Sequence, residues 1–305
     1  MSLAISRFLS LSITAVLIVV ACARPSAEAD RASHSVVAAG SVLSADSVGV
    51  LLAAGDIAMC THGATETARL LDKLQGDIIV VGDAAYPSER DPNPYLTCYD
   101  STWGRHKKRT HPTPGNHDVE VIGMYFDYFG AAAGARPGGY YSFDVGRWHV
   151  LALNSNIEMG PRSPQGRWAA ADLAAHRTEC TLAYMHHPRF SSGPHQLNRL
   201  VLPMWRLLDS AGVDVVVSGH DHIYERFAPM GASGTRDDRK GVRLFIAGTG
   251  GAYRYEMKKV APNSEARSSD AHGILELKLT PGKYTWRFVP TALSDFTDSG
   301  SGTCH

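Results

Sequence analysis

The first third of the chain alternates apolar runs with polar residues that directly follow a glycine. Three segments show the spacing of a strand, a helix and a strand, in that order: residues 48–54, 65–74 and 77–81. The two strand-like runs end at Gly55-Asp56 and Gly82-Asp83, so an acidic residue stands just past each predicted strand. Such a unit favours a parallel sheet, which binds ligands at the carboxyl ends of its strands.

Strand patterns dominate the rest of the chain. Further strands are predicted at residues 110–113, 140–145, 148–153, 182–185, 213–217, 242–247, 274–279 and 284–289. Helices are predicted at residues 165–177 and 197–210, the second interrupted or started at Pro203. Because strands outnumber helices late in the chain, we expect an α/β fold with two sheets packed face to face and helices on the outside.

Composition excludes some classes of function. The 305 residues contain 30 Lys+Arg and 30 Asp+Glu, so the chain has no formal net charge. A nucleic-acid-binding protein usually carries a clear basic excess, and we therefore expect no nucleic-acid partner. The balanced charge also gives no reason to expect adsorption to an anionic membrane surface.

The N-terminal residues have the features of an export signal. Arg7 precedes an apolar stretch, residues 8–21, that is short for a membrane span. We expect residues 1–21 to be a signal peptide and residues 22–47, rich in alanine and serine, to be a flexible tether. Residues 48–305 would then form the folded domain.

Three ways of processing this leader stay open. Residues 19–22 read Val-Val-Ala-Cys and resemble a bacterial lipobox, which implies cleavage before Cys22 and lipid attachment to it. Ordinary signal peptidase could instead cut after Ala23 or Ala29, or the segment could stay as an uncleaved anchor. In each case the protein is exported, to the bacterial cell envelope as a lipoprotein or as a secreted protein.

The remaining cysteines are candidates for disulfides, because export places them in an oxidising compartment. They are Cys60, Cys98, Cys180 and Cys304. Four cysteines allow three pairings, and the sequence alone does not choose among them. We favour Cys60–Cys98, which would join two early loops, and Cys180–Cys304, which would fix the C-terminal tail.

Five predicted strands end in a residue able to bind a metal. The segments are Gly55-Asp56, Gly82-Asp83-Ala84-Ala85-Tyr86, Gly115-Asn116-His117-Asp118, His186-His187-Pro188 and Gly219-His220-Asp221-His222. Each signal alone is weak, because a single aspartate usually caps a turn and a single histidine is usually a structural hydrogen-bonding group. His220 and His222 are more informative, since residues two apart on an extended segment point to the same side and would turn Asp221 away.

In this order the motifs resemble those of the calcineurin-like metallophosphoesterases, and among them the purple acid phosphatases, whose signature runs GDxG, GDxxY, GNH(D/E), HxP and GHxH. The resemblance covers residues 51–249 and departs from the signature at Ala58, where the family usually has glycine. It implies a four-layer α/β/β/α sandwich of two mixed sheets flanked by helices. It also implies a site for two metal ions.

The resemblance assigns seven metal ligands: Asp56, Asp83, Tyr86, Asn116, His186, His220 and His222. Asp83 would bridge the two ions. Oxygen and imidazole ligands suit iron, zinc or manganese, and the Tyr86 phenolate would favour ferric iron beside a divalent ion. For Tyr86, packing as a core or turn aromatic before Pro87 is the alternative interpretation.

Two further histidines are candidates for catalysis. By resemblance, His117 and His195 would reach the phosphate or protonate the leaving alkoxide while a metal-bound hydroxide attacks phosphorus. Either could instead orient a ligand from behind, as we expect of Asp118. His187 follows His186 on a strand end, so we expect its side chain to point away from the site and to be structural.

The function implied by the resemblance is hydrolysis of small phosphomonoesters, as in an acid phosphatase. A phosphodiesterase or nucleotidase on the same fold is one alternative. A catalytically silent envelope protein that binds a partner is another. The sequence predicts neither the physiological ester nor the oligomeric state.

Overall fold

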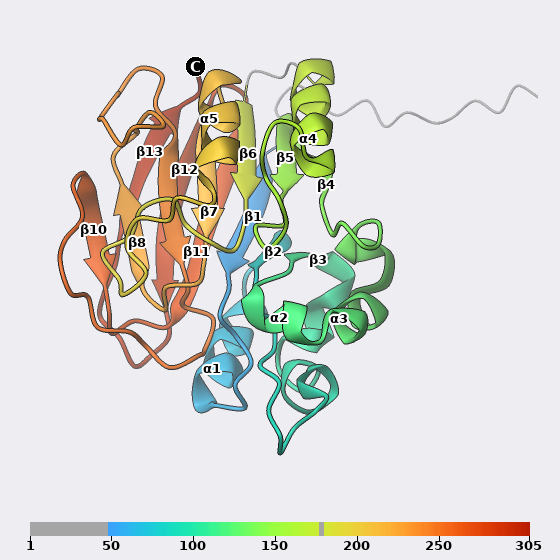
Figure 1. Cartoon of the computed structure of the whole chain (residues 1–305). Helices are drawn as coiled ribbons and strands as arrows, with labels where there is room; N and C mark the ends of the chain where they lie inside the picture. Colours follow the sequence, from blue (N-terminus) through green and yellow to red (C-terminus); the bar gives the residue numbers. More distant parts are fainter. Residues whose placement is uncertain (1–47, 177–179) are drawn as a thin grey trace, which may run out of the picture. The chain divides into compact units, whose positions relative to one another are not determined.

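The computed structural model describes residues 48–176 and 180–305 (Figure 1). The predicted signal peptide, the tether and the lipidation site at Cys22 all lie outside these residues. Among the described helices, none has the length and apolar character needed to cross a membrane.

The first sheet has six strands in the order β13-β12-β11-β1-β2-β3. Its parallel half follows the predicted strand–helix–strand unit, and its antiparallel half comes from the end of the chain. The strands are β1 (Gly49–Ala54), β2 (Asp77–Val81), β3 (Thr110–Thr113), β11 (Gly273–Thr280), β12 (Lys283–Pro290) and β13 (Ser299–Thr303). The C-terminal hairpin therefore completes a sheet that the N-terminal strands begin.

The second sheet has seven strands in the order β10-β8-β9-β7-β6-β5-β4. Its central strands β5, β6, β7 and β9 run parallel, and antiparallel strands lie at both edges. The strands are β4 (Tyr141–Val145), β5 (Trp148–Ala152), β6 (Cys180–Tyr184), β7 (Val215–Ser218), β8 (Tyr224–Phe227), β9 (Arg243–Ala247) and β10 (Ser264–Ser268). Both sheets are thus mixed, as predicted.

The helices are short and connect the strands. They are α1 (His62–Leu71), α2 (Asn116–Glu120), α3 (Ile122–Phe129), α4 (Pro164–Ala175) and α5 (Leu202–Ser210). A π-helical turn and two 3-10 turns add to them: Tyr95–Tyr99, Trp103–Arg109 and Gly130–Ala133. Figure 1 shows α4 and α5 over the second sheet and α2 and α3 together near β3.

Alternate residues of the central strands pack on opposite faces, and this creates the layers. In β1, Leu51 belongs to the core between the two sheets, while Leu52 packs on the outer side with α1 and α3. In β6, Leu182 faces the core between the sheets and Ala183 faces α5. Strands buried on both faces read as continuous apolar runs, which is what the sequence shows. The predicted four-layer sandwich is confirmed.

Some element boundaries differ from the sequence-based ones. The first helix begins three residues earlier than predicted, and α5 begins at Leu202 because Pro203 fits the first turn, so residues 197–201 form a loop. Strands β10 and β13 were missed since they are polar, partly exposed edge strands without an apolar pattern. Strand β8 and the short helices α2 and α3 were missed as well.

Both favoured disulfides are present. Cys60 is joined to Cys98 and Cys180 to Cys304, across sequence separations of 38 and 124 residues. The second bond ties the start of β6 to the segment after β13, so it links the two sheets.

The Cys180–Cys304 bond is expected to contribute more to stability than Cys60–Cys98. A cross-link restricts the unfolded chain more when it closes a longer loop. Removing both cysteines of the longer bond (Cys180→Ala with Cys304→Ala) should lower the free energy of unfolding by about 2–5 kcal/mol. The Cys60→Ala/Cys98→Ala protein is the matched control and should lose roughly 1 kcal/mol less. Urea denaturation measures both, and an equal or reversed order would contradict the expectation.

Candidate functional site

The five sequence motifs meet where the parallel strands of both sheets end. Asp56 and Asp83 follow β1 and β2, Asn116 follows β3, and His186 and His220 follow β6 and β7. Three of these residues leave the strand in a left-handed backbone conformation, with φ of 59° at Asp56, 49° at Asp83 and 69° at His220. Non-glycine residues rarely adopt this conformation, and its recurrence at strand ends marks a functional site.

One group of side chains gathers around the imidazole of His222. Its Nε2 lies 3.3 Å from Asp56 Oδ1 and 3.2 Å from the Tyr86 hydroxyl. The hydroxyl is in turn 3.3 Å from Asp56 Oδ1. Three donor atoms from three strand ends therefore converge on one point.

A second group gathers around His186. Its Nε2 lies 3.0 Å from Asn116 Oδ1 and 3.2 Å from His220 Nδ1. Asp83 Oδ2 is 3.4 Å from the same nitrogen. One donor atom from each of Asp56, Asp83 and His186 also lies within 4.8 Å of the others, so Asp83 stands between the two groups.

Hydrogen bonds behind the imidazoles determine which nitrogen faces the site. His186 Nδ1 lies 2.9 Å from the Val81 carbonyl oxygen, and His222 Nδ1 contacts the Tyr253 carbonyl oxygen. Because a carbonyl oxygen only accepts, each Nδ1 must carry a proton and donate it. In the neutral rings, His186 Nε2 then directs its lone pair at an oxygen of Asp83, and His222 Nε2 directs its lone pair at an oxygen of Asp56; both carboxylate oxygens are acceptors. The Tyr86 hydroxyl, which donates to Asp56, is not part of this conflict. A shared cation between these atoms removes the conflict, so the donor set fits metal ions.

In the absence of metal ions, the close packing of these side chains shifts their pKa values. Burial opposes the charge on Asp83, but His186 outweighs it and holds the pKa of this carboxyl below its usual value. Burial likewise opposes the charge on His186, yet Asp83 outweighs it and raises the pKa of the imidazole to about 9. Burial and then Asp56 raise the pKa of Tyr86 far above normal. Asp83 and Tyr86 therefore each need a positive partner to carry a negative charge.

Asp118 holds two of the motif loops together. Its carboxylate accepts hydrogen bonds from the backbone N–H groups of Ala84, Ala85 and Gly115 and from the Tyr95 hydroxyl. Burial and the charge of Asp83 raise its pKa to about 6. Asp118 thus joins the loops that carry Asp83 and Asn116, which agrees with its expected role behind the ligands.

Glycine before a candidate ligand is required by close packing. A Cβ atom on Gly115 would lie 2.1 Å from Asp83 Oδ1, and one on Gly82 would lie 2.3 Å from His186 Nδ1. Such distances are far inside van der Waals contact. Each glycine therefore makes room for the ligand of another motif.

His117 lies at the edge of the candidate centre. Its backbone N–H donates to Asp83 Oδ1 at 2.9 Å, and its ring centroid is 4.5 Å from that of Tyr86. Its Nδ1 lies 2.8 Å from Glu120 Oε1, and its side chain is 39% exposed. The position leaves this imidazole reachable by a substrate from solvent.

His195 approaches the candidate centre from the loop between β6 and α5. Its ring centroid is 4.0 Å from that of His220, and its Nδ1 lies 2.7 Å from Asp221 Oδ1. Asp221 is fully buried and contacts His195 through its Oδ1. The buried carboxylate orients an imidazole that is itself 42% exposed.

The expected orientation of His187 is wrong. Its ring centroid lies 5.0 Å from that of His186 and 4.4 Å from that of His220, beside the candidate ligands. The chain is no longer extended after β6, so the two-residue alternation does not apply. Ser155 accepts a hydrogen bond from the His187 backbone N–H at 3.0 Å and lies 2.8 Å from its Nδ1.

Tyr255 was also missed. Its ring stacks on that of His222 with the centroids 3.9 Å apart and the planes 7° apart. No motif contains this residue, and the pattern around it gives no signal of its place.

Similarity to known proteins agrees with this geometry. A model of the family described as calcineurin-like phosphoesterase matches residues 49–224, more than half of the chain. Purple acid phosphatase 21 of Arabidopsis thaliana is 31% identical over 69% of this chain and 54% of its own length. The Fe(3+)-Zn(2+) purple acid phosphatase 12 of the same plant is 26% identical over 68% and 52%.

Solved structures share the fold. A purple acid phosphatase from yellow lupin seeds superposes with a TM-score of 0.71 at 16% identity, over 84% of this chain and 54% of that one. GAP50, titled the anchor in the inner membrane complex of Plasmodium, superposes with a TM-score of 0.65 at 15% identity, over 85% and 90%. The chain spans about half the length of the curated relatives it matches. It belongs to the calcineurin-like phosphoesterase family and is similar to purple acid phosphatases.

Proposed function

We propose that the protein is a phosphomonoesterase that works with two metal ions. The observation that supports this most strongly is the convergence of seven side chains from five strand ends into two adjoining groups of donor atoms. Uncompensated burial of the Asp56 and Asp83 carboxylates would be costly, and bound cations offset that cost.

The proposed ligands divide as the two groups do. Asp56, Tyr86 and His222 would hold one ion. Asn116, His186 and His220 would hold the other, with Asp83 shared between them. Iron, zinc and manganese suit these oxygen and imidazole donors, and one relative carries Fe(3+)-Zn(2+) in its name. Bound ions would supply Lewis acidity, lowering the pKa of a water molecule and neutralising the phosphate oxygens.

The remaining work falls to the protein's own side chains. His117 and His195 lie on opposite sides of the donor groups, each with its Nδ1 beside a carboxylate. A carboxylate at Nδ1 fixes the orientation of the ring. When the imidazole is protonated, its Nε2 carries a proton that can be given to a substrate oxygen. One of these imidazoles would bind the phosphate, and the other would protonate the leaving alcohol.

Export is part of the proposal. Two disulfides lie within the described domain, and such bonds persist outside the reducing cytoplasm. Lipidation at Cys22 remains a prediction from the sequence.

A catalytically silent protein is the second candidate, because GAP50 shares the fold and is titled an anchor. The complete donor set argues against it, since a protein that binds only a partner has no need of seven converging ligands. The two candidates differ in metal content and in turnover.

A substrate panel tests the proposed reaction. We expect the metal-loaded protein to hydrolyse p-nitrophenyl phosphate with a higher kcat/KM than bis-p-nitrophenyl phosphate or nucleotides, measured by release of nitrophenol or phosphate. Faster turnover of the diester would instead favour a phosphodiesterase. A protein that holds two metals and hydrolyses none of these esters would contradict the proposal.

Replacement of single histidines separates metal binding from proton transfer. His220→Ala should lower metal content and activity together, because its Nδ1 is a proposed ligand. His117→Ala should keep both ions and lower kcat by about 100-fold, as expected for loss of a general acid or a phosphate contact. Elemental analysis beside steady-state kinetics measures both, and loss of metal in the His117 variant would contradict its role.

Tyr86 decides the chemistry of the first ion. If its phenolate binds ferric iron, the protein as isolated should show a visible charge-transfer band. Tyr86→Phe should remove the band while keeping Asp56 and His222 as ligands. His117→Ala is the control, because its ring packs on Tyr86 without being a proposed ligand. A wild-type protein with iron and no visible band would exclude phenolate ligation.

A further inference from the structure

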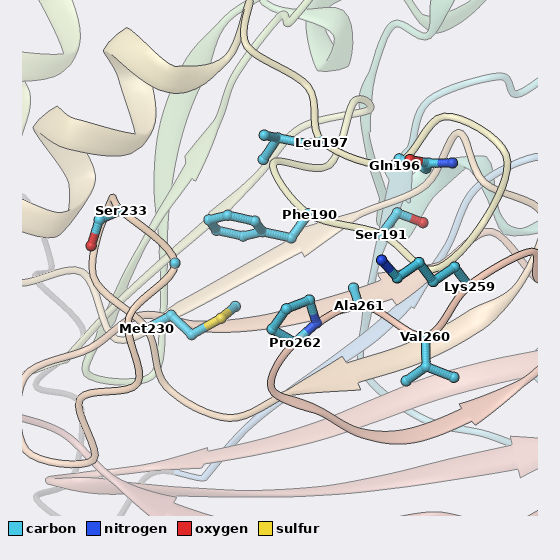
Figure 2. Close-up of a pocket in the computed structure, with 11 residues that line it drawn as sticks. Phe190, Ser191, Gln196, Leu197, Met230, Ser233, Lys259, Val260, Ala261 and Pro262 are labelled. Carbon is cyan, nitrogen blue, oxygen red and sulfur yellow. The ribbon is translucent and has the colours of Figure 1, made fainter.

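A cavity of about 310 Å³ is lined in part by the loop that follows β6 (Figure 2). Its volume is at the lower end of the range typical of small-molecule sites. The eleven lining residues come from three segments: Phe190, Ser191, Gln196 and Leu197; Met230, Ser233 and Gly234; and Lys259, Val260, Ala261 and Pro262. We call this cavity the side pocket.

Two of the three segments adjoin residues that pack on the proposed metal ligands. His195, whose ring is 4.0 Å from that of His220, is followed directly by the lining residue Gln196. Tyr255, which stacks on His222, begins the stretch that reaches Lys259 four residues later. The side pocket therefore borders His195, whose ring packs on the candidate centre.

The walls are held in place by a buried network. The Ser192 hydroxyl accepts from the Ala261 backbone N–H at 2.8 Å, and the Ser192 carbonyl oxygen accepts from the Lys258 backbone N–H at 3.3 Å. Ser192 also donates to the fully buried carboxylate of Glu225, at 2.5 Å from the hydroxyl and 2.8 Å from the backbone N–H. These bonds join the 190–197 and 258–262 segments, so the side pocket is formed before a ligand binds.

Most of the apolar side chains lie at one end of the side pocket, which we call the apolar end. Figure 2 shows Phe190, Leu197, Met230 and Pro262 on that side together with Ser233, and Gln196, Ser191, Lys259 and Val260 on the other. Leu197 and Val260 are each 48% exposed, so they offer apolar surface to a ligand. Among the eleven lining residues one is basic and none is acidic, so a positively charged ligand is disfavoured.

We propose that the side pocket binds the alcohol part of the substrate and selects phosphomonoesters of uncharged aromatic alcohols. This inference rests on the proposed phosphatase function. The phosphate would lie at the metal centre beside His195, the aromatic ring would lie against Phe190 and Leu197, and Lys259 would favour the approach of an anionic ester. Esters of small polar alcohols leave the apolar end empty, and esters of cationic alcohols meet the lysine.

Selectivity between substrates tests the proposal better than a single rate. The measured quantity is kcat/KM for 1-naphthyl phosphate divided by kcat/KM for glycerol 2-phosphate, with phosphocholine and AMP as further substrates. Leu197→Glu should lower this ratio about tenfold by placing a charge against the ring, while turnover of glycerol 2-phosphate stays the same. Dividing the ratio of a variant by the ratio of the wild-type protein cancels the difference in leaving-group reactivity between the two esters.

The chain offers a matched control for Leu197→Glu and for a second change, Lys259→Gln. Leu200 lies in the same loop and is 82% exposed but does not line the side pocket, so Leu200→Glu should leave the ratio unchanged. Lys259→Gln should raise KM for 1-naphthyl phosphate, whereas Lys258→Gln should not, because Lys258 is outside the lining.

The outcomes separate this proposal from the one it rests on. If the protein hydrolyses these esters but Leu197→Glu and Leu200→Glu give the same ratio, the side pocket does not bind the alcohol. If Leu197→Glu lowers turnover of AMP and not of 1-naphthyl phosphate, the assigned class of alcohol is wrong. If the metal-loaded wild-type protein hydrolyses no ester, the phosphatase function itself fails.

Discussion

The candidate centre depends on how closely the strand ends approach one another. At Gly82 and Gly115 the space that a Cβ would fill is occupied by the ligand side chain of another motif. The approach at Gly82 crosses the molecule, because His186 follows a strand of the second sheet and packs on Gly82 of the first, whereas Gly115 and Asp83 both follow strands of the first sheet. The full set of candidate ligands therefore comes together only when the two sheets are packed.

Burial makes this arrangement costly without a cation. Asp56, Asp83 and His186 are at most 1% exposed, and no Lys or Arg forms an ion pair with them among the described residues. Protons on the imidazoles offset part of that cost, as the raised pKa of His186 indicates. A metal ion competes with those protons for the same lone pairs, so metal binding and folding stability are linked.

The sequence predicts those features of the fold that a local residue pattern determines. Apolar runs ending in polar residues located the parallel strands and brought Asp56, Asp83, Asn116, His186 and His220 to one edge, because strand ends align within a sheet. His187 was misplaced since strand alternation stops where the backbone turns. The polar edge strands and the start of α5 were missed or shifted because tertiary packing and a proline, rather than periodicity, determine them.

The specificity that we propose would lie in the part of the chain with the weakest sequence pattern. The side pocket and the Tyr255 contact come from loops after β6, β8 and β9, where neither alternation nor helical spacing is visible. Their places are determined by single buried bonds, above all those of Ser192 with Glu225 and Ala261. Loops on a rigid scaffold can change without disturbing the layers beneath them. The same metal-binding motifs can therefore serve different esters, and the choice among them depends on residues that no motif contains.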